Sequence, residues 1–158
     1  MSSDSNAIRR LNDNKLMRSR SEVVEFETAL GEISGSPTQA SLSELHLVLD
    51  DACEHPDVMY GVVHLLESFD AAEQIGALFE ILPQLVVRAA GWAETLHCRI
   101  LNDEAARAIY ARCLPRYAAP TVAVAHEIVG GLAVGGDSEL ATAAHAVLVA
   151  TNAGVPSR

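Results

Sequence analysis

Hydrophobic positions recur with a helical period along most of the chain. From residue 57 onward they fall at i, i+1, i+4, i+7, i+8 and i+11, which is one continuous stripe of an α-helix. The stripe consists of Val58, Met59, Val62, Leu65, Leu66 and Phe69. No segment shows the strict alternation of apolar and polar residues that marks a half-buried strand. The pattern therefore predicts an all-α protein.

Capping residues, glycines and prolines divide the pattern into about eight short helices. Ser41 and Glu44 have capping-box spacing, as do Asp70 and Glu73. Pro83 is expected to end one helix, because proline removes a backbone donor and crowds the preceding turn. The expected helices cover residues 22–33, 41–52, 57–69, 70–82, 83–90, 122–132 and 138–150, with a segment around Trp92 after Gly91 and a helix capped by Asn102 or Asp103 that runs to Leu114.

The loops between these helices are short, so neighbouring helices should pack as antiparallel hairpins. Successive hairpins can stack as an irregular HEAT-like solenoid or close into a compact bundle, and the sequence leaves both open. Residues 1–20 are polar and weakly patterned, which suggests a tail or a loosely packed first helix. Residues 21–158 are expected to form a single all-helical domain, a size that suits one core.

Charge is distributed very unevenly along the chain. Residues 1–20 carry five bases and two acids, residues 21–87 carry thirteen acids and no Lys or Arg, and residues 88–158 carry six of each. Such an acidic half repels nucleic-acid phosphates and attracts basic partners. Without local bases it should also lack the usual surface ion pairs. The alternative is a merely solvated acidic surface.

We expect the protein to stay in the cytoplasm and to have no membrane partner. The amino-terminal residues contain five bases but no apolar stretch of the kind a signal peptide needs. The longest uncharged run, residues 140–157, is interrupted by polar residues and by Pro156, so it is too polar for a membrane span. Cys53, Cys98 and Cys113 form no CxxC pair, and their odd number suits a reducing compartment.

Four polar or amphipathic residues follow one side of the predicted third helix. Tyr60, His64 and Glu67 lie at i, i+4 and i+7, and Asp57 lies one turn earlier. A histidine and two carboxylates could bind a metal or move protons, although further ligands would have to come from another helix. A His64 satisfied by Glu67 is the simplest alternative. Recognition of a partner is the third, because Tyr often anchors interfaces and carboxylates pair with Arg or Lys.

Asp50, Asp51, Glu54 and Asp57 place four carboxylates within eight residues, around the expected end of the second helix. Acids at a helix carboxyl end oppose its dipole, so their clustering suggests a use outside folding. The row of His46, Asp50 and Cys53 matches no established zinc spacing, and the loop lacks the alternating oxygen ligands of a calcium site.

No constellation for catalysis is present. The chain has no Gly-rich phosphate loop, GxSxG elbow or HExxH motif, so we expect no catalytic residues, no metal and no cofactor. Trp92 is expected to anchor the core, and Arg99, near Asn102, to pair with a carboxylate of the acidic half.

Several short motifs resemble the immunity protein 30 family of bacterial polymorphic-toxin systems. They are LHLVLDD at Leu45–Asp51, VMYGVVHLLESF at Val58–Phe69, Trp92, and RILND at Arg99–Asp103, so the similarity covers roughly residues 42–115. The resemblance implies an all-helical protein that is encoded beside a toxin and neutralises it by direct binding. The residues that carry it are Asp50, Asp51, Tyr60, His64, Glu67, Trp92, Arg99 and Asn102.

The resemblance and the charge pattern point to the same surface. We expect the second and third helices and their connecting loop to bind the cognate toxin, for which a basic nuclease is one candidate. Asp50, Asp51, Glu54 and Asp57 would attract it, and Tyr60 and Glu67 beside His64 would anchor it. Charge reversal at Asp51 and Glu54 should then slow association with little loss of fold. The alternative is a helical-repeat scaffold or a homodimeric interaction module, and an enzyme is the third hypothesis.

Overall fold

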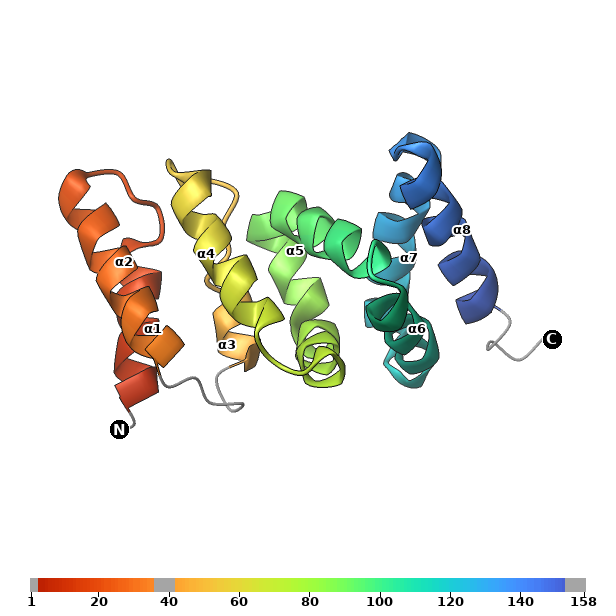
Figure 1. The fold of residues 1–158 in the computed structure, drawn as a ribbon, viewed down its shortest axis with the longest axis horizontal. Helices are drawn as coiled ribbons and strands as arrows, with labels where there is room; N and C mark the ends of the chain where they lie inside the picture. Colours follow the sequence, from red (N-terminus) through yellow and green to blue (C-terminus); the bar gives the residue numbers. More distant parts are fainter. Residues whose placement is uncertain (1–2, 36–41, 153–158) are drawn as a thin grey trace. The chain divides into compact units, whose positions relative to one another are not determined.

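The computed structural model of the chain describes residues 3–35 and 42–152 (Figure 1). These residues form eight α-helices and one short 3-10 helix, with no strand among them, so the all-α prediction is confirmed. The arrangement of hairpins as a solenoid or a bundle stays a prediction. The helices are α1 (Ser3–Asn14), α2 (Arg20–Gly35), α3 (Leu42–His46), α4 (Pro56–Glu67), α5 (Ala71–Leu101), α6 (Glu104–Cys113), α7 (Ala119–Gly135) and α8 (Ser138–Asn152), and the 3-10 helix η2 covers Leu114–Arg116.

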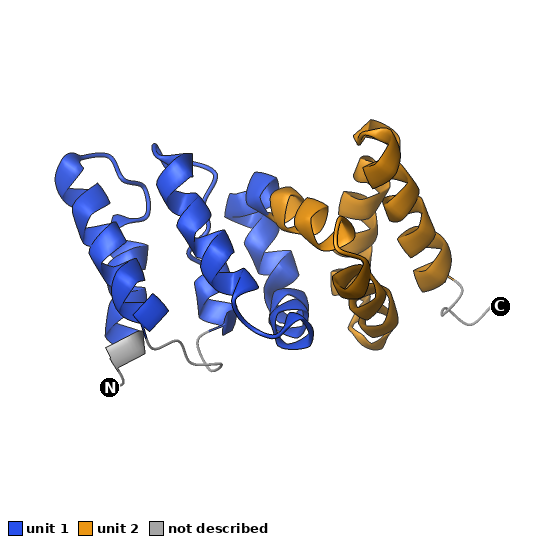
Figure 2. Cartoon of the chain, viewed as in Figure 1, with its two compact units in different colours: residues 1–92 blue, residues 93–158 orange. Residues whose placement is uncertain are grey.

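The chain divides into two compact units, residues 1–92 and residues 93–158 (Figure 2). In unit 1, α1 and α2 lie side by side as an antiparallel hairpin, and α4 packs on α2 and α3. In unit 2, α7 and α8 form a second hairpin, and α6 packs on α8. The division falls inside α5, so that helix contributes to both units.

The first twenty residues contain the well-formed helix α1. Its apolar side chains Ile8 and Leu11 are buried, and so is Met17 in the loop that follows. Met17 has a φ of 50°, a left-handed conformation that bulky residues seldom adopt. Its complete burial offsets the local strain, and the loop thereby reverses the chain between α1 and α2.

The second predicted helix is much shorter than expected. α3 ends at His46, and Val48 and Leu49 follow in a tight turn whose N–H groups donate to the carbonyls of Leu45 and His46. Val48 and Leu49 are nevertheless buried, which explains why their spacing resembled a helix. Ala52 is exposed, so its predicted burial is wrong. The predicted cap at Ser41 lies outside the described residues.

The clearest predicted helix is confirmed as α4, whereas Pro83 does not end a helix. α5 continues through Pro83, which lies inside it, and its backbone leaves the helical region only at Ala89, with φ −139° and ψ 43°. Ala89 is completely buried. The break therefore falls close to Gly91, the residue that was expected to separate two helices. It falls there because polar groups of the backbone at that point form hydrogen bonds with groups outside the helix.

The helices of unit 2 agree with the sequence pattern. Asp103, rather than Asn102, caps α6, since its carboxylate accepts a hydrogen bond of 3.0 Å from the N–H of Ala106. α7 and α8 extend the predicted helices by a few residues at their ends.

α5 is long and apolar enough to cross a membrane by length and composition, but half of its most apolar stretch is buried inside the structure, as in a core helix.

Candidate functional site

One side of α4 presents the four residues whose spacing the sequence singled out. We call Asp57, Tyr60, His64 and Glu67 the α4 row. Three of them are exposed and Tyr60 is half-buried. The opposite side of the helix carries the buried stripe of Met59, Val62, Val63 and Leu66. Because the stripe faces the core, the row faces outward, where a macromolecule can reach it.

The ring of Tyr60 is held in place by aromatic neighbours. Its centroid lies 5.6 Å from that of Trp92, in an edge-to-face arrangement, and 5.3 Å from that of His64. Trp92 is only 8% exposed, and its Nε1–H donates to the carbonyl oxygen of Asp50 at 3.2 Å. Tyr60 is therefore a rigid, partly exposed ring, a type of side chain that loses little entropy on contact with a partner.

The loop before α4 is fixed to the loop between α1 and α2. The N–H of Glu54 donates to the carbonyl of Leu16 at 2.9 Å. The Asp50 carboxylate lies 3.4 Å from Lys15 Nζ and accepts a hydrogen bond from the N–H of Ala52 at 2.9 Å. Asp50 is only 6% exposed. It therefore does not lie on the outer surface where the sequence placed it, because Lys15 and the loop backbone surround its carboxylate.

Asp51 has a structural use that the sequence reading did not foresee. Its carboxylate accepts hydrogen bonds from the N–H groups of Gly91 at 2.8 Å and Trp92 at 3.2 Å, and its own N–H donates to the carbonyl of Arg88. It thereby caps the helical turn that restarts after Ala89. A Cβ at position 91 would lie 3.1 Å from Asp51 Oδ1, so glycine permits this close approach.

The prediction that the acids of this loop oppose the dipole at the end of a helix is consequently wrong. α3 ends at His46, before these acids, so they do not oppose the end of that helix. Asp51 instead caps a helical turn, and Asp57 lies in the first turn of α4, where a negative charge favours the dipole. Both carboxylates contribute to folding.

Bases from residues 1–20 neutralise part of the acidic half. Arg10 bridges Glu25 and Glu32, at 2.6 Å each, Lys15 pairs with Asp50, and Arg18 lies 3.4 Å from Glu22. The backbone N–H and the guanidinium of Arg18 lower the pKa of Glu22. The expectation that residues 21–87 lack ion pairs is thus wrong, because their bases come from the preceding block.

Part of the acidic charge that remains outward lies beside the α4 row. Glu54 and Asp57 are both exposed, and neither forms an ion pair within the described part of the chain. Asp57 lies in the first turn of α4, one turn before Tyr60, and Glu54 lies in the loop just before the helix. This arrangement combines a fixed aromatic ring with unneutralised carboxylates, which suits a basic protein surface.

The side chains near this loop that could bind a metal are buried or take part in other interactions. His46 is completely buried; its Nδ1 lies 2.7 Å from the carbonyl oxygen of Leu42 and its Nε2 lies 3.1 Å from the side-chain amide of Gln74. Burial raises the pKa of the Cys53 thiol, which opposes the thiolate that zinc prefers. Among the described residues, no group of three His, Cys, Asp or Glu side chains is placed to hold a metal ion.

The remaining predicted residues lie in unit 2. Arg99 is exposed near the end of α5, and Asn102 is exposed in the turn before α6, where its N–H donates to the carbonyl of Cys98. The proposed pairing of Arg99 with a carboxylate of the acidic half stays a prediction. Both residues lie in unit 2, whereas α4 lies in unit 1.

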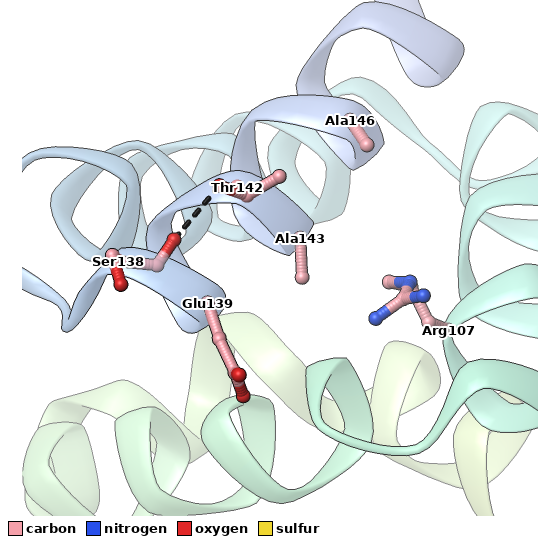
Figure 3. Close-up of a pocket in the computed structure, with 6 residues that line it drawn as sticks. All are labelled: Arg107, Ser138, Glu139, Thr142, Ala143 and Ala146. Atoms are coloured by element: carbon pink, nitrogen blue, oxygen red, sulfur yellow. Dashed lines mark hydrogen bonds between the residues drawn. The ribbon is translucent and has the colours of Figure 1, made fainter.

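Unit 2 contains an open hollow of about 440 Å³ between α6 and α8 (Figure 3). Arg107 points toward it from α6, but its Nη1 donates to the carbonyl of Leu101 at 2.7 Å. The Thr142 hydroxyl likewise donates to the carbonyl of Ser138 at 2.7 Å. Both polar groups form hydrogen bonds with backbone carbonyls, so we assign no site to the hollow.

Comparison with known proteins decides the family. The sequence profile of the immunity protein 30 family matches residues 13–110, more than half of the chain. The chain belongs to the immunity protein 30 family. The matched range includes the α4 row, its preceding loop and the cap at Asp51, whereas α7 and α8 lie beyond it. Searches of curated proteins and of solved structures give no match.

The sequence reading missed three residues of unit 1 that shape this region of the immunity protein. Lys15 lies in a segment read as a polar tail, although it reaches Asp50. Val87 and Arg88, on α5, line hollows beside the loop that carries Asp51. One signal for them was available: Arg88 is the first base after sixty-seven residues without one.

Proposed function

We propose that this immunity protein binds a cognate toxin domain directly and neutralises it, and that the α4 row with Glu54 forms part of the contact. Family membership supports the general role. The more specific proposal, that this surface forms part of the contact, rests on one observation. A fixed aromatic ring, Tyr60, lies in the same region as the outward carboxylates of Glu54 and Asp57.

The chemistry of this surface favours a basic partner. Carboxylates without a counter-ion accelerate the encounter with a positively charged protein at low salt, with rate constants up to roughly 10⁸–10⁹ M⁻¹s⁻¹ for the best-steered complexes. A nuclease domain carries such charge because it must bind phosphates. The immunity protein would then cover the basic path that nucleic acid otherwise occupies.

The expected place of action is the cytoplasm. Cys53, Cys98 and Cys113 are all free thiols, which accords with a reducing compartment. Binding rather than catalysis is the proposed activity, since the polar groups around α4 offer a surface and not a nucleophile with its base.

Charge reversal tests the surface. The double variant Glu54→Lys/Asp57→Lys should bind the toxin domain encoded beside the gene with an association rate constant lowered about tenfold at low salt, because steering is lost. Biosensor kinetics at several salt concentrations measure this change, and the difference should shrink as salt screens the charges.

The matched control is Glu104→Lys/Glu127→Lys, which makes the same change in net charge in unit 2. Glu104, like Asp57, lies in the first turn of a helix, so the two double variants carry a similar penalty from the helix dipole. Equal rates for the two double variants would remove the α4 surface from the proposal.

A further inference from the structure

Val87 is a strongly exposed apolar side chain on α5, one turn before Gly91. It is 78% exposed, and it lines two open hollows of unit 1, of about 340 and 490 Å³. Both hollows are lined by Val87 and Arg88, so we treat them as one groove, the Val87 groove. The lining is largely apolar: Leu47, Leu49 and Leu85 line the first hollow, and Leu16 and Val86 line the second.

Two bases and two acids line this groove, and they differ in their partners. Lys15 and Asp50 line the groove but neutralise each other at 3.4 Å. Asp51 is engaged by the N–H groups of Gly91 and Trp92. Arg88 is exposed and forms no ion pair within the described ranges. The groove thus combines a largely apolar lining with one guanidinium that has no ion-pair partner, whereas the exposed Asp51 carboxylate is held by helix N–H groups.

The groove is continuous with the proposed toxin-binding surface. Asp51 and Ala52 line it, and Glu54 follows them in the same loop. A partner that covers Glu54 therefore reaches the edge of the Val87 groove. The Arg88 guanidinium beside the carboxylates of the α4 surface helps to fix the orientation of a partner, because a reversed orientation brings like charges together.

We propose that the Val87 groove receives an apolar side chain of the toxin domain and that a carboxylate next to that side chain pairs with Arg88. This inference rests on the proposed function and adds the chemistry of a second contact. The apolar contact slows dissociation, whereas the α4 surface accelerates association. The two contacts together specify a partner with a basic patch beside an apolar and acidic segment.

Site-specific photo-crosslinking tests the groove in the full chain. Benzoylphenylalanine replaces Val87 in one variant and Val24 in the control, since Val24 is an exposed valine of α2, 54% accessible. The purified toxin domain encoded beside the gene is the probe. We expect a crosslinked heterodimer from position 87 and none, or far less, from position 24.

A second measurement separates the two contacts kinetically. Arg88→Glu and Val87→Asp should each raise the dissociation rate constant about tenfold while circular dichroism remains that of the folded protein. A complex that forms normally with neither crosslinking at 87 nor faster dissociation overturns the groove and leaves the proposed function intact. Crosslinking of the chain to a second copy of itself also overturns it. No complex with the unmodified chain overturns both proposals.

Discussion

Two histidines are buried with both ring nitrogens in hydrogen bonds. His97 Nδ1 lies 2.7 Å from the carbonyl oxygen of Ala93, and His97 Nε2 lies 2.7 Å from the hydroxyl of Tyr110. Burial lowers the pKa of His97 and keeps the ring neutral; because a carbonyl oxygen can only accept, Nδ1 carries the proton and Nε2 accepts from the Tyr110 hydroxyl. His46 has the same arrangement in unit 1, with Leu42 and Gln74 as partners.

These histidines should make the protein sensitive to mild acid. Burial lowers the pKa of His46 and of His97 to about 4, against 6.5 in the unfolded chain. The unfolded chain therefore takes up protons first, and stability that is complete above pH 6.5 is lost as the pH falls toward 4. At pH 5 each histidine should cost about 2 kcal/mol. Urea unfolding at pH 7 and pH 5 measures the loss.

The exposed His64 provides the control for this experiment. His64→Gln should leave the difference between the two pH values unchanged, because its ring lies on the outside of α4. Equal urea midpoints at pH 7 and pH 5 for the unmodified protein would contradict the buried, neutral state of the two rings.

At the residue scale, the sequence predicted only what local geometry determines. The α4 row follows from helical spacing within one segment, and the outward position of Asp57 and His64 agrees with it. The uses of Asp50 and Asp51 could not be predicted in this way, because their partners Lys15, Gly91 and Trp92 lie far away in the sequence. Such contacts depend on tertiary packing.

At the scale of elements, α5 shows how a loop can decide where a helix breaks. Its backbone passes through Pro83 and leaves helical geometry at Ala89. Asp51 supplies an acceptor for two N–H groups beyond the break and a donor for the carbonyl of Arg88. The loop that precedes α4 is therefore part of the architecture of α5.

Removal of this cap should destabilise unit 1. Asp51→Ala leaves two helix N–H groups without their acceptor and should lower the free energy of unfolding by about 1–2 kcal/mol. Glu54→Ala removes the same charge three residues later in the loop and should change stability much less. Chemical denaturation of both variants gives the comparison, and similar losses in the two would show that the cap contributes little. The earlier expectation that charge reversal at Asp51 spares the fold is replaced by this one.

The ends of the helices were predicted well where a local residue such as a cap marks them. They were predicted poorly where tertiary packing determines where a helix ends. Asp103 caps α6 as the sequence suggested, and α4 begins and ends close to its predicted limits. Pro83 and the turn at Val48 and Leu49 contradicted the pattern. In both places buried neighbours stabilise a backbone that local preferences alone disfavour.

At the scale of the whole molecule, net charge is a poor guide to where charge is available. The protein carries a net charge of −10, yet four of its acids pair with bases from residues 1–20. Glu54 and Asp57 remain outward beside Tyr60, in the part of the chain that the family profile matches. The proposed recognition is therefore assigned to this surface because a fixed aromatic ring lies beside its carboxylates, and not because of the overall acidity of the protein.

The central claim is tested most directly by co-purification of the unmodified chain with the proposed toxin, the carboxy-terminal domain of the product encoded beside its gene, at low and at high salt. We expect a stable complex at both, with association that slows steeply as salt increases, because charge steers the encounter. Absence of a complex at either salt concentration would contradict direct neutralisation and would leave the scaffold or homodimer as the better explanation of this fold.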